Sequence, residues 1–311
     1  MKEKKYVLGV DGGGSKTTAI LVALDGSVIA DLHTEATNPQ NLGYDVSASI
    51  LVGLIRDICQ KANCSIAEIK SVVMGIAGIG RQRDVDALLN SIETNARKQK
   101  LQLPQIRLET DARIALEAAF ASGPGIALIA GTGSIAIAKN EDGKIFRLGG
   151  WGRVLGDEGS GYSIALNAIK AAIKAYEGRG DRTALLNLVI EHFECESLEE
   201  LIYKIKLENA DIASFAPKVL KAAMEFDHIS HNILFNQANE LAELVRTLVN
   251  KIHPKKKIPV ALMGGLLENE NIYSKMVKER VSRSLPQIVI QKPKFPTAFG
   301  AAILGLNAFN F

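Results

Sequence analysis

Val7-Leu-Gly-Val-Asp11-Gly-Gly-Gly-Ser-Lys-Thr17-Thr18 stands near the start of the sequence, and the apolar run Ala19-Ile-Leu-Val-Ala-Leu24 follows it directly. A buried strand that runs into three glycines, with a second strand after them, predicts a hairpin with a glycine tip. Glycine lets the backbone approach a ligand closely, and successive exposed N–H groups form a concavity that suits an anion such as phosphate. Asp11 lies where Mg²⁺, or its waters, could be held against that phosphate. For one such stretch alone, an ordinary hairpin turn is the alternative.

The same pattern returns at Gly125-Ile-Ala-Leu-Ile-Ala130-Gly131-Thr132-Gly133-Ser134, which the apolar run Ile135-Ala-Ile-Ala138 follows. An apolar strand again meets a glycine-rich tip with hydroxyl side chains, and a second apolar strand comes next. Two hairpins of this kind, each opening one half of the chain, indicate an internal duplication.

On these motifs the chain resembles the actin-like ATPase and sugar kinase superfamily, and within it the BadF/BadG/BcrA/BcrD family, which includes N-acetylglucosamine kinases. The resemblance extends over nearly the whole chain. It implies that the two tips bind the phosphates of ATP with Mg²⁺ at Asp11. The residues implied to bind phosphate are Gly12, Gly13, Gly14, Ser15, Lys16 and Thr17 in the first tip, and Gly131, Thr132, Gly133 and Ser134 in the second.

Alternating strand and helix patterns in both halves favour an α/β architecture with mixed sheets. Together with the resemblance, they predict a duplicated actin-like (ribonuclease H-like) fold of two domains, residues 1–122 and 123–311, with a cleft between them. Gly123-Pro124-Gly125 is the expected boundary, and the final helix, near 297–305, is a candidate for packing back on the first domain. Gly300 and Gly305 in that helix are expected to serve close packing.

The elements expected from the patterns are as follows. Strands are expected near 27–36, 72–76, 106–108, 144–148, 258–263 and 288–290, and helices near 44–62, 83–99, 112–122 and after 265. A long helical section is expected over 161–252. Thr37–Gly43 is expected to be a loop because it is rich in Asn, Pro and Gly.

Composition places the chain among ordinary globular proteins. It has 311 residues, 47% hydrophobic and 23% charged, and a formal net charge of +3 that is too small to imply a nucleic-acid partner. Cys59, Cys64 and Cys195 have no metal-ligand spacing and form no disulfide framework. Free thiols without a signal peptide or membrane-spanning run favour a cytoplasmic location and no membrane partner. A homodimer remains a candidate assembly.

Asp111 is the expected general base. It follows a predicted strand and begins a predicted helix, so its carboxylate should project into the cleft. An Asp at a helix N-terminus is also a common cap, and the pattern alone leaves both roles open. The resemblance favours catalysis, because the family's catalytic Asp stands in the equivalent strand-to-helix turn. It would accept the proton of a sugar hydroxyl during phosphoryl transfer.

Asn38, Trp151 and Asp157 are the expected sugar-binding residues, together with Asp111. The only tryptophan lies in the glycine-rich stretch Gly149-Gly150-Trp151-Gly152, where an aromatic ring could meet the apolar face of a sugar, although a tryptophan packed under a loop is also common. In N-acetylglucosamine kinases an equivalent Trp and Asp line the sugar site. Gly264-Gly265, after a strand, resembles the adenosine-binding motif of the superfamily; a helix-packing turn is its alternative.

Ile135 departs from the pattern of animal N-acetylglucosamine kinases, which have an Asn after Gly-Thr-Gly-Ser. A binding site that lacks one hydrogen-bond partner loses selectivity. The resemblance implies ATP-dependent phosphorylation of an amino sugar, with N-acetylglucosamine to its 6-phosphate as the leading reaction. Glucosamine, N-acetylmuramate or another hexose are the alternative acceptors.

Other functional classes are disfavoured. Ser15 replaces the glycine that a P-loop requires before its lysine, and no Gly-x-Gly-x-x-Gly follows a strand. Activator ATPases of 2-hydroxyacyl-CoA dehydratases carry an iron–sulfur cluster on cysteines, and residues 65–194 contain none. A sugar-responsive regulator would need a DNA-binding helix-turn-helix, and only five residues precede the first expected strand.

Overall fold

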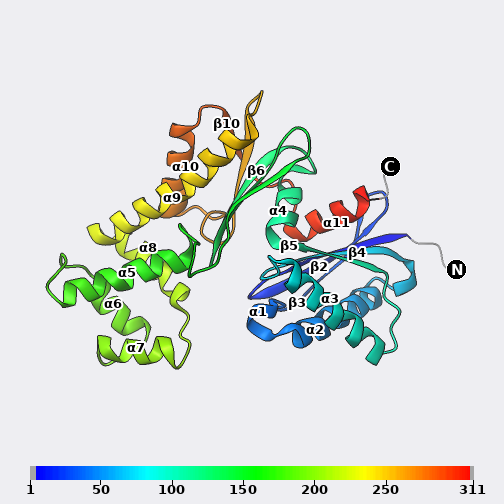
Figure 1. Ribbon diagram of the computed structural model, residues 1–311, viewed down its shortest axis with the longest axis horizontal. Helices are drawn as coiled ribbons and strands as arrows, with labels where there is room; N and C mark the ends of the chain where they lie inside the picture. The colour runs from blue at the N-terminus through cyan, green and yellow to red at the C-terminus, as the bar shows by residue number, and fades with distance from the viewer. Residues whose placement is uncertain (1–4, 309–311) are drawn as a thin grey trace. The chain divides into compact units, whose positions relative to one another are not determined.

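The computed structural model describes residues 5–308, which divide into two compact units (Figure 1). Unit 1 comprises the described residues up to Gly123 and those from Pro293 onward, and unit 2 comprises Pro124–Lys292. The second domain was predicted to comprise residues 123–311, with the final helix as a candidate for packing back on the first domain. In the structure that helix belongs to unit 1.

Unit 1 is built on a five-stranded sheet. Its strands are β1 (Tyr6–Gly12), β2 (Lys16–Ala23), β3 (Val28–Glu35), β4 (Ile69–Ile76) and β5 (Gln105–Thr110). Its helices are α1 (Pro39–Leu42), α2 (Tyr44–Lys61), α3 (Gln82–Lys98), α4 (Asp111–Phe120) and α11 (Thr297–Asn307), with a short 3₁₀ turn, η1 (Ile66–Glu68). Helices α2 and α3 pack together on one face of the sheet, and α4 and α11 cover the other (Figure 1).

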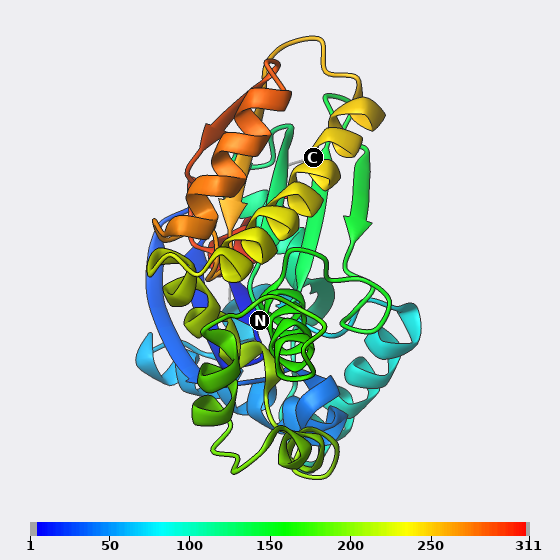
Figure 2. The same cartoon turned by 90° about the vertical axis from the view of Figure 1, so that its left-hand side faces the viewer.

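Unit 2 contains a second five-stranded sheet and most of the helical chain. Its strands are β6 (Gly125–Ala130), β7 (Ser134–Lys139), β8 (Ile145–Gly149), β9 (Ile258–Met263) and β10 (Ile288–Gln291). Its helices are α5 (Gly161–Tyr176), α6 (Leu185–His192), α7 (Leu198–Lys206), α8 (Ala216–Met224), α9 (His228–Ile252) and α10 (Ile272–Ser284), with a 3₁₀ turn, η2 (Ile212–Phe215). Helices α9 and α10 lie side by side against the sheet (Figure 2).

The two sheets share one topology. Their orders are β3-β2-β1-β4-β5 and β8-β7-β6-β9-β10. In each sheet, the first three strands along the chain form an antiparallel meander. The fourth strand pairs in parallel with the first, and the fifth pairs in parallel with the fourth. The predicted duplicated α/β fold is therefore confirmed.

One predicted loop is wrong. Residues Pro39–Leu42 form the short helix α1, which Asn38 caps by accepting a hydrogen bond from the Gln40 amide at 2.9 Å. Asn and Pro are typical of loops, but they are also the preferred residues at a helix N-cap and at the first helical position. The helix matters for the site because its N-cap hydrogen bond fixes the Asn38 side chain.

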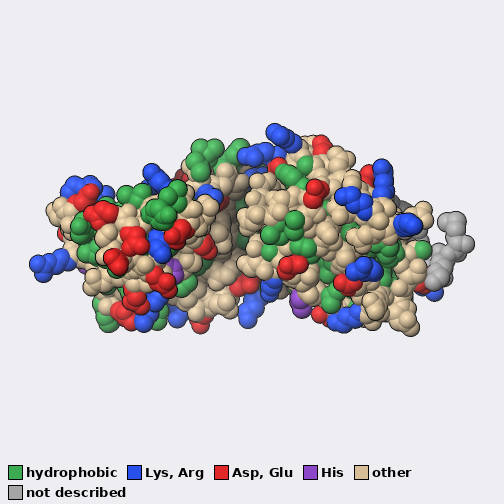
Figure 3. Space-filling model, turned by 90° about the horizontal axis from the view of Figure 1, so that it is seen from below, with side chains coloured by type: hydrophobic (Ala, Val, Ile, Leu, Met, Phe, Trp, Pro, Cys, Tyr) green, Lys and Arg blue, Asp and Glu red, His purple; other side chains and the backbone are tan. Residues whose placement is uncertain are grey.

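The surface and the helices carry two further observations. Acidic and basic side chains are interspersed over the face shown in Figure 3, with no area of one sign dominating it. Within residues 5–308, none of the helices combines the length and apolar composition that crossing a membrane would require.

Candidate active site

The first glycine tip joins β1 to β2. The Gly13 amide donates to the Lys16 carbonyl at 3.0 Å and closes the turn, while Gly14, Ser15 and Lys16 are exposed. Thr17 is instead fully buried, and its hydroxyl shares a 2.8 Å hydrogen bond with that of Thr37. The tip is thus held from within through Thr17 and exposes Gly14, Ser15 and Lys16 to solvent.

The last residue of β1 must be glycine. A Cβ on Gly12 would lie 2.4 Å from the Thr37 hydroxyl oxygen and 2.5 Å from Ile76 Cδ1, both far inside van der Waals contact. The Gly12 carbonyl accepts a hydrogen bond from the Ala77 amide at 2.8 Å. The glycines of this motif therefore have two roles: Gly12 allows close packing below the tip, and Gly14 is exposed at it.

Asp11 precedes the tip on β1 and is half-buried, opposite Thr18 of β2 and Gly75 of β4. In the part of the chain that the structure describes, no group of three or more His, Cys, Asp or Glu side chains is arranged to hold a metal ion. Mg²⁺ does not need such a group, because it usually takes one or two carboxylates and completes its shell with phosphate oxygens and water. A single carboxylate beside a glycine tip fits that mode of binding.

Asn38 lies beside the first tip. A Cβ on Gly14 would be 4.0 Å from Asn38 Nδ2, so the amide nitrogen faces the tip while Oδ1 caps α1. Gly78 packs directly against the amide, since a Cβ there would lie 2.4 Å from Asn38 Oδ1. The Gln40 side chain donates to the Gly78 carbonyl at 3.1 Å and closes the arrangement.

Asp111 is the first residue of α4, and the capping role belongs to its neighbour. Thr110 is the N-cap, and its hydroxyl accepts from the Arg113 amide at 3.2 Å. Asp111 is exposed, and its Oδ1 accepts a 2.8 Å hydrogen bond from the Ala112 amide. The carboxylate is thus oriented by a backbone amide at the positive end of the helix dipole, where negative charge is stabilised.

The second glycine tip is tied to the start of α5. The Gly131 carbonyl accepts from the Gly161 amide at 2.8 Å, and the Gly131 amide donates to the Gly133 carbonyl at 2.9 Å. Ser134 is buried, and its hydroxyl donates to the Glu158 carbonyl at 2.7 Å. Thr132 is the exposed residue of this tip.

Asp157 lies under this tip in a strained backbone conformation, with φ of 63°. Its Oδ1 accepts from the Ser134 amide at 3.4 Å, and a Cβ on Gly133 would meet its carboxylate at 3.1 Å. Burial raises the pKa of Asp157, and the neighbouring Glu158 carboxylate adds to the rise, while backbone hydrogen bonds from Ser134 and Gly152 oppose it. A buried carboxylate in the left-handed region is costly, which is typical of functional positions.

Trp151 lies in an open loop, with 71% of its surface exposed. Gly149, Gly150 and Gly152 around it have φ of 70°, 67° and 84°, a region that favours glycine. Ile135 packs beneath this loop, because a Cβ on Gly150 would lie 2.8 Å from Ile135 Cδ1. The ring is therefore not a core residue but an exposed aromatic surface.

Gly264 and Gly265 lie next to the second tip. Gly264 has φ of 86°, and a Cβ there would lie 2.5 Å from the Ala130 carbonyl oxygen. The Gly265 amide nitrogen is 3.9 Å from the position of a Cβ on Gly131. The structure thus brings the predicted adenosine motif and the second phosphate motif together.

The predicted site residues divide between the units. Unit 1 carries the first tip with Asp11, Asn38 and Asp111; unit 2 carries the second tip, Trp151, Asp157 and the Gly264–Gly265 turn. Two supporting groups were not predicted from the sequence: the Thr37 hydroxyl and the Gly78 backbone. Only Gly78 had a sequence signal, since it lies in the glycine-rich stretch after the strand at 72–76.

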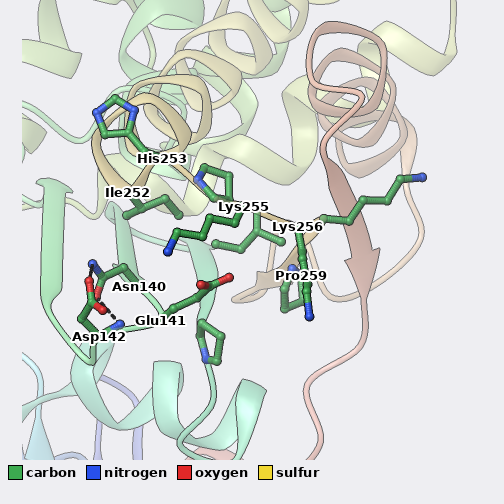
Figure 4. A pocket seen from close by; sticks show the side chains of 12 residues that line it. Asn140, Glu141, Asp142, Ile252, His253, Lys255, Lys256 and Pro259 are labelled. Carbon is green, nitrogen blue, oxygen red and sulfur yellow. Dashed lines mark hydrogen bonds between the residues drawn. The ribbon is translucent and has the colours of Figure 1, made fainter.

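A pocket of about 90 Å³ in unit 2 holds none of these residues. It lies between the Asn140–Asp142 turn, the end of α9 and the start of β9 (Figure 4). The second glycine tip and Gly264 follow the ends of β6 and β9, whereas this pocket adjoins their beginnings, at Pro124 and Ile258. It is therefore at the opposite edge of the sheet from the predicted site.

Comparison with known proteins decides the family. The profile of the BadF/BadG/BcrA/BcrD ATPase family matches residues 8–305. The chain belongs to this family. The predicted resemblance is thus confirmed, and with it the use of ATP that the family name states.

Relatives align over nearly their whole length. An N-acetylmuramic acid/N-acetylglucosamine kinase from Clostridium acetobutylicum is 33% identical over 96% of this chain and 98% of its own. An N-acetyl-D-glucosamine kinase from Dictyostelium discoideum is 28% identical over 98% of this chain and 99% of its own. The solved structure of a candidate N-acetylglucosamine kinase from Chromobacterium violaceum matches with a TM-score of 0.77 and 26% identity, over 97% of this chain and 99% of that chain.

Proposed function

We propose that this ATP-dependent sugar kinase phosphorylates N-acetylglucosamine on its 6-hydroxyl group. The observation that carries the proposal is the end-to-end similarity to the Clostridium and Dictyostelium relatives, both named as kinases of this sugar. The motifs that the reaction needs are present in the matched region: two glycine tips, an aspartate that begins a helix and an exposed tryptophan.

Phosphoryl transfer depends mainly on positioning the reactants and neutralising charge. The exposed first-tip residues Gly14, Ser15 and Lys16, and Thr132 of the second tip, are proposed to contact the ATP phosphates. Thr17 and Ser134 use their hydroxyls inside the protein, so their proposed part is to fix each tip. The Gly264–Gly265 turn is proposed to receive the adenosine, because it lacks side chains where it adjoins Gly131.

Asp11 is proposed to hold Mg²⁺, directly or through water. The ion would supply charge neutralisation for the phosphate groups when bound. The protein's part is to keep one carboxylate at the end of a buried strand, next to the phosphate tip.

Asp111 is proposed as the general base. The 6-hydroxyl oxygen of the sugar forms a bond to the γ-phosphorus, the bond from that phosphorus to the β–γ bridging oxygen breaks, and ADP leaves. Asp111 accepts the hydroxyl proton as this happens. The Ala112 amide, which donates to Asp111 Oδ1, keeps the carboxylate oriented for that transfer.

The sugar is proposed to contact Asn38, Trp151 and Asp157. These residues supply an amide, an exposed aromatic face and a carboxylate, which suit a pyranose with several free hydroxyl groups. Ile135 offers an apolar surface where animal enzymes have an amide. One missing hydrogen bond is worth about 0.5–1.5 kcal/mol, so we expect tolerance of glucosamine, N-acetylmuramate or a related hexose.

A panel of acceptors tests this proposal. ADP release is measured with saturating ATP and Mg²⁺ and with N-acetylglucosamine, glucosamine, N-acetylmuramate or glucose. We expect the highest kcat/KM for N-acetylglucosamine and measurable activity on at least one other amino sugar. A strong preference for glucose, with N-acetylglucosamine inert, would show that the substrate is wrong. Hydrolysis of ATP with no dependence on any sugar would favour an activator ATPase instead.

A further inference from the structure

Arg147 lies at the base of the Trp151 loop, on edge strand β8. It pairs with Ile137 of β7 and so shares a sheet face with Ile135, two residues along, which packs under the loop. Its side chain is exposed. An exposed arginine on an edge strand would ordinarily extend into water, but this one turns back onto the loop.

Two contacts fix the guanidinium. Arg147 Nη2 donates a 2.6 Å hydrogen bond to the Gly150 carbonyl, and the guanidinium carbon lies 6.0 Å from the centre of the Trp151 ring. A hydrogen bond from a charged donor is about twice as strong as a neutral one, whereas 6 Å is near the outer limit of a cation–π contact. The hydrogen bond therefore contributes most of the attachment, and the ring contact adds orientation.

The loop backbone depends on contacts of this kind to hold its shape. Three of the four residues in Gly149–Gly152 are glycines with positive φ, and such residues are the most freely rotating in an unconstrained loop. Gly150 is fixed from both sides: Ile135 and Arg147 Nη2 would lie 2.8 and 3.2 Å from a Cβ there. Its amide donates to the Ser134 carbonyl at 3.0 Å.

One chain of contacts thus runs from Arg147 to the other predicted ligand groups of unit 2. Arg147 binds the Gly150 carbonyl, the Gly150 amide binds Ser134, and the Ser134 amide binds Asp157. Trp151 also packs against the residue before Asp157, since a Cβ on Gly156 would lie 3.1 Å from Trp151 Cβ.

We infer that Arg147 is a positioning residue for the sugar: its guanidinium holds the Gly149–Gly152 loop so that the Trp151 ring is oriented to receive the acceptor. This inference rests on the proposed role of Trp151 in sugar binding. Arg147 acts through the loop and not on the reacting atoms. Its loss should therefore weaken sugar binding more than it slows phosphoryl transfer.

The single tryptophan makes the inference testable without activity. Arg147→Met keeps most of the aliphatic stem and removes all donors, and Arg147→Lys keeps the charge but loses the planar fork. Arg280→Met is the matched control, because Arg280 lies on α10 and stacks at 3.9 Å on Phe235 of α9 in the same unit. Time-resolved fluorescence anisotropy reports the local motion of Trp151 in each variant.

In Arg147→Met we expect a larger fast component in the anisotropy decay, and a sugar KM raised about tenfold, equivalent to about 1.4 kcal/mol. The ATP KM should be unchanged, and kcat should change less than about threefold. Arg147→Lys should fall between the wild type and Arg147→Met, and Arg280→Met should match the wild type in both measurements.

Three results would overturn the inference. The first is an anisotropy decay and a sugar KM that both stay at wild-type values in Arg147→Met. The second is a raised KM with unchanged ring motion, because Arg147 would then contact the sugar itself. The third is altered ring motion with unchanged KM. Failure of the wild-type protein to phosphorylate any sugar would instead overturn the proposed function, while the anisotropy measurement would still report on the Arg147 contact.

Discussion

Asp111 is the residue on which the proposed chemistry depends. It begins α4, Thr110 caps that helix in its place, and the Ala112 amide orients its carboxylate. Because Asp111 is not the N-cap, its replacement should leave the helix largely intact. Catalysis and stability can therefore be separated at this position.

Asp111→Asn tests the base. General-base assistance contributes about 10²–10⁴ in rate, so kcat should fall by that factor while KM for ATP and sugar and the Tm change little. Asp45→Asn is the matched control: Asp45 lies in the first turn of α2 and accepts a 2.9 Å hydrogen bond from the Ser91 hydroxyl. A kcat for Asp111→Asn within about threefold of the wild type would remove Asp111 from this role.

Ionisation of Asp157 should make the free energy of unfolding depend on pH. Burial, with a contribution from Glu158, raises the pKa of its carboxyl above the ordinary value of 3.8. The native state then holds the proton to higher pH than the unfolded chain does. The free energy of unfolding should therefore fall as pH rises from near 3.8 through the raised pKa, because ionisation of Asp157 is disfavoured in the fold.

Asp157→Asn should remove this penalty. Asn tolerates positive φ and can still accept the Ser134 hydrogen bond, so we expect a higher Tm than the wild type at pH 7.5 and a difference that shrinks toward pH 4. The sugar KM should rise at the same time. Asp142→Asn, at an exposed turn of the same unit, should show no such trend. The Tm of both proteins is measured by thermal unfolding across this pH range. If the Tm of Asp157→Asn minus that of the wild type is smaller at pH 7.5 than at pH 4, the expected direction of the pH dependence is wrong.

At the scale of elements, α11 is placed by its small residues. A Cβ on Gly300 would lie 2.0 Å from the Ile114 carbonyl oxygen, and one on Gly9 would lie 2.3 Å from the Ala298 carbonyl oxygen. Helix α11 therefore meets the backbones of α4 and β1 directly. The expectation that Gly300 and Gly305 serve close packing is confirmed, since a Cβ on Gly305 would lie 2.4 Å from Val7 Cγ1.

Two alanine substitutions should have opposite effects. Gly300→Ala forces backbone atoms apart and should cost about 1–3 kcal/mol or more of the free energy of unfolding. Gly53→Ala, in the middle of α2, meets no atom within 4 Å and should stabilise by up to about 1 kcal/mol through helix propensity. Chemical denaturation of both variants measures this. Equal effects of the two substitutions would contradict the packing of α11.

The order of the elements could be predicted because each carries a local pattern: apolar runs for β4 and β9, helical spacing for α2, and glycine tips between strands. The placement of Asn38, which caps α1, could not be predicted, because Asn38 followed by Pro39 fits a loop and a helix start equally. Contacts such as Ser134 with Asp157, or Gly300 with Ile114, join residues distant in sequence, and no local pattern contains them.

At the scale of the whole molecule, the predicted site residues belong to two units, and neither unit holds a complete set. A ligand that contacts both sets favours the conformation in which both contacts form. We therefore expect small-angle scattering to show a smaller radius of gyration with N-acetylglucosamine and a non-hydrolysable ATP analogue together than with either one alone. An unchanged radius under saturation with both would count against closure.

Phosphorus NMR of the reaction product tests the central claim most directly. The wild-type protein is incubated with ATP, Mg²⁺ and N-acetylglucosamine, and the proton-coupled spectrum is recorded, with Asp111→Asn as the control. The proposal predicts a new phosphomonoester signal split into a triplet by the two C6 protons, formed together with ADP and nearly absent with the variant. A doublet would place the phosphate on a ring carbon, and ADP with inorganic phosphate and unmodified sugar would contradict sugar phosphorylation altogether.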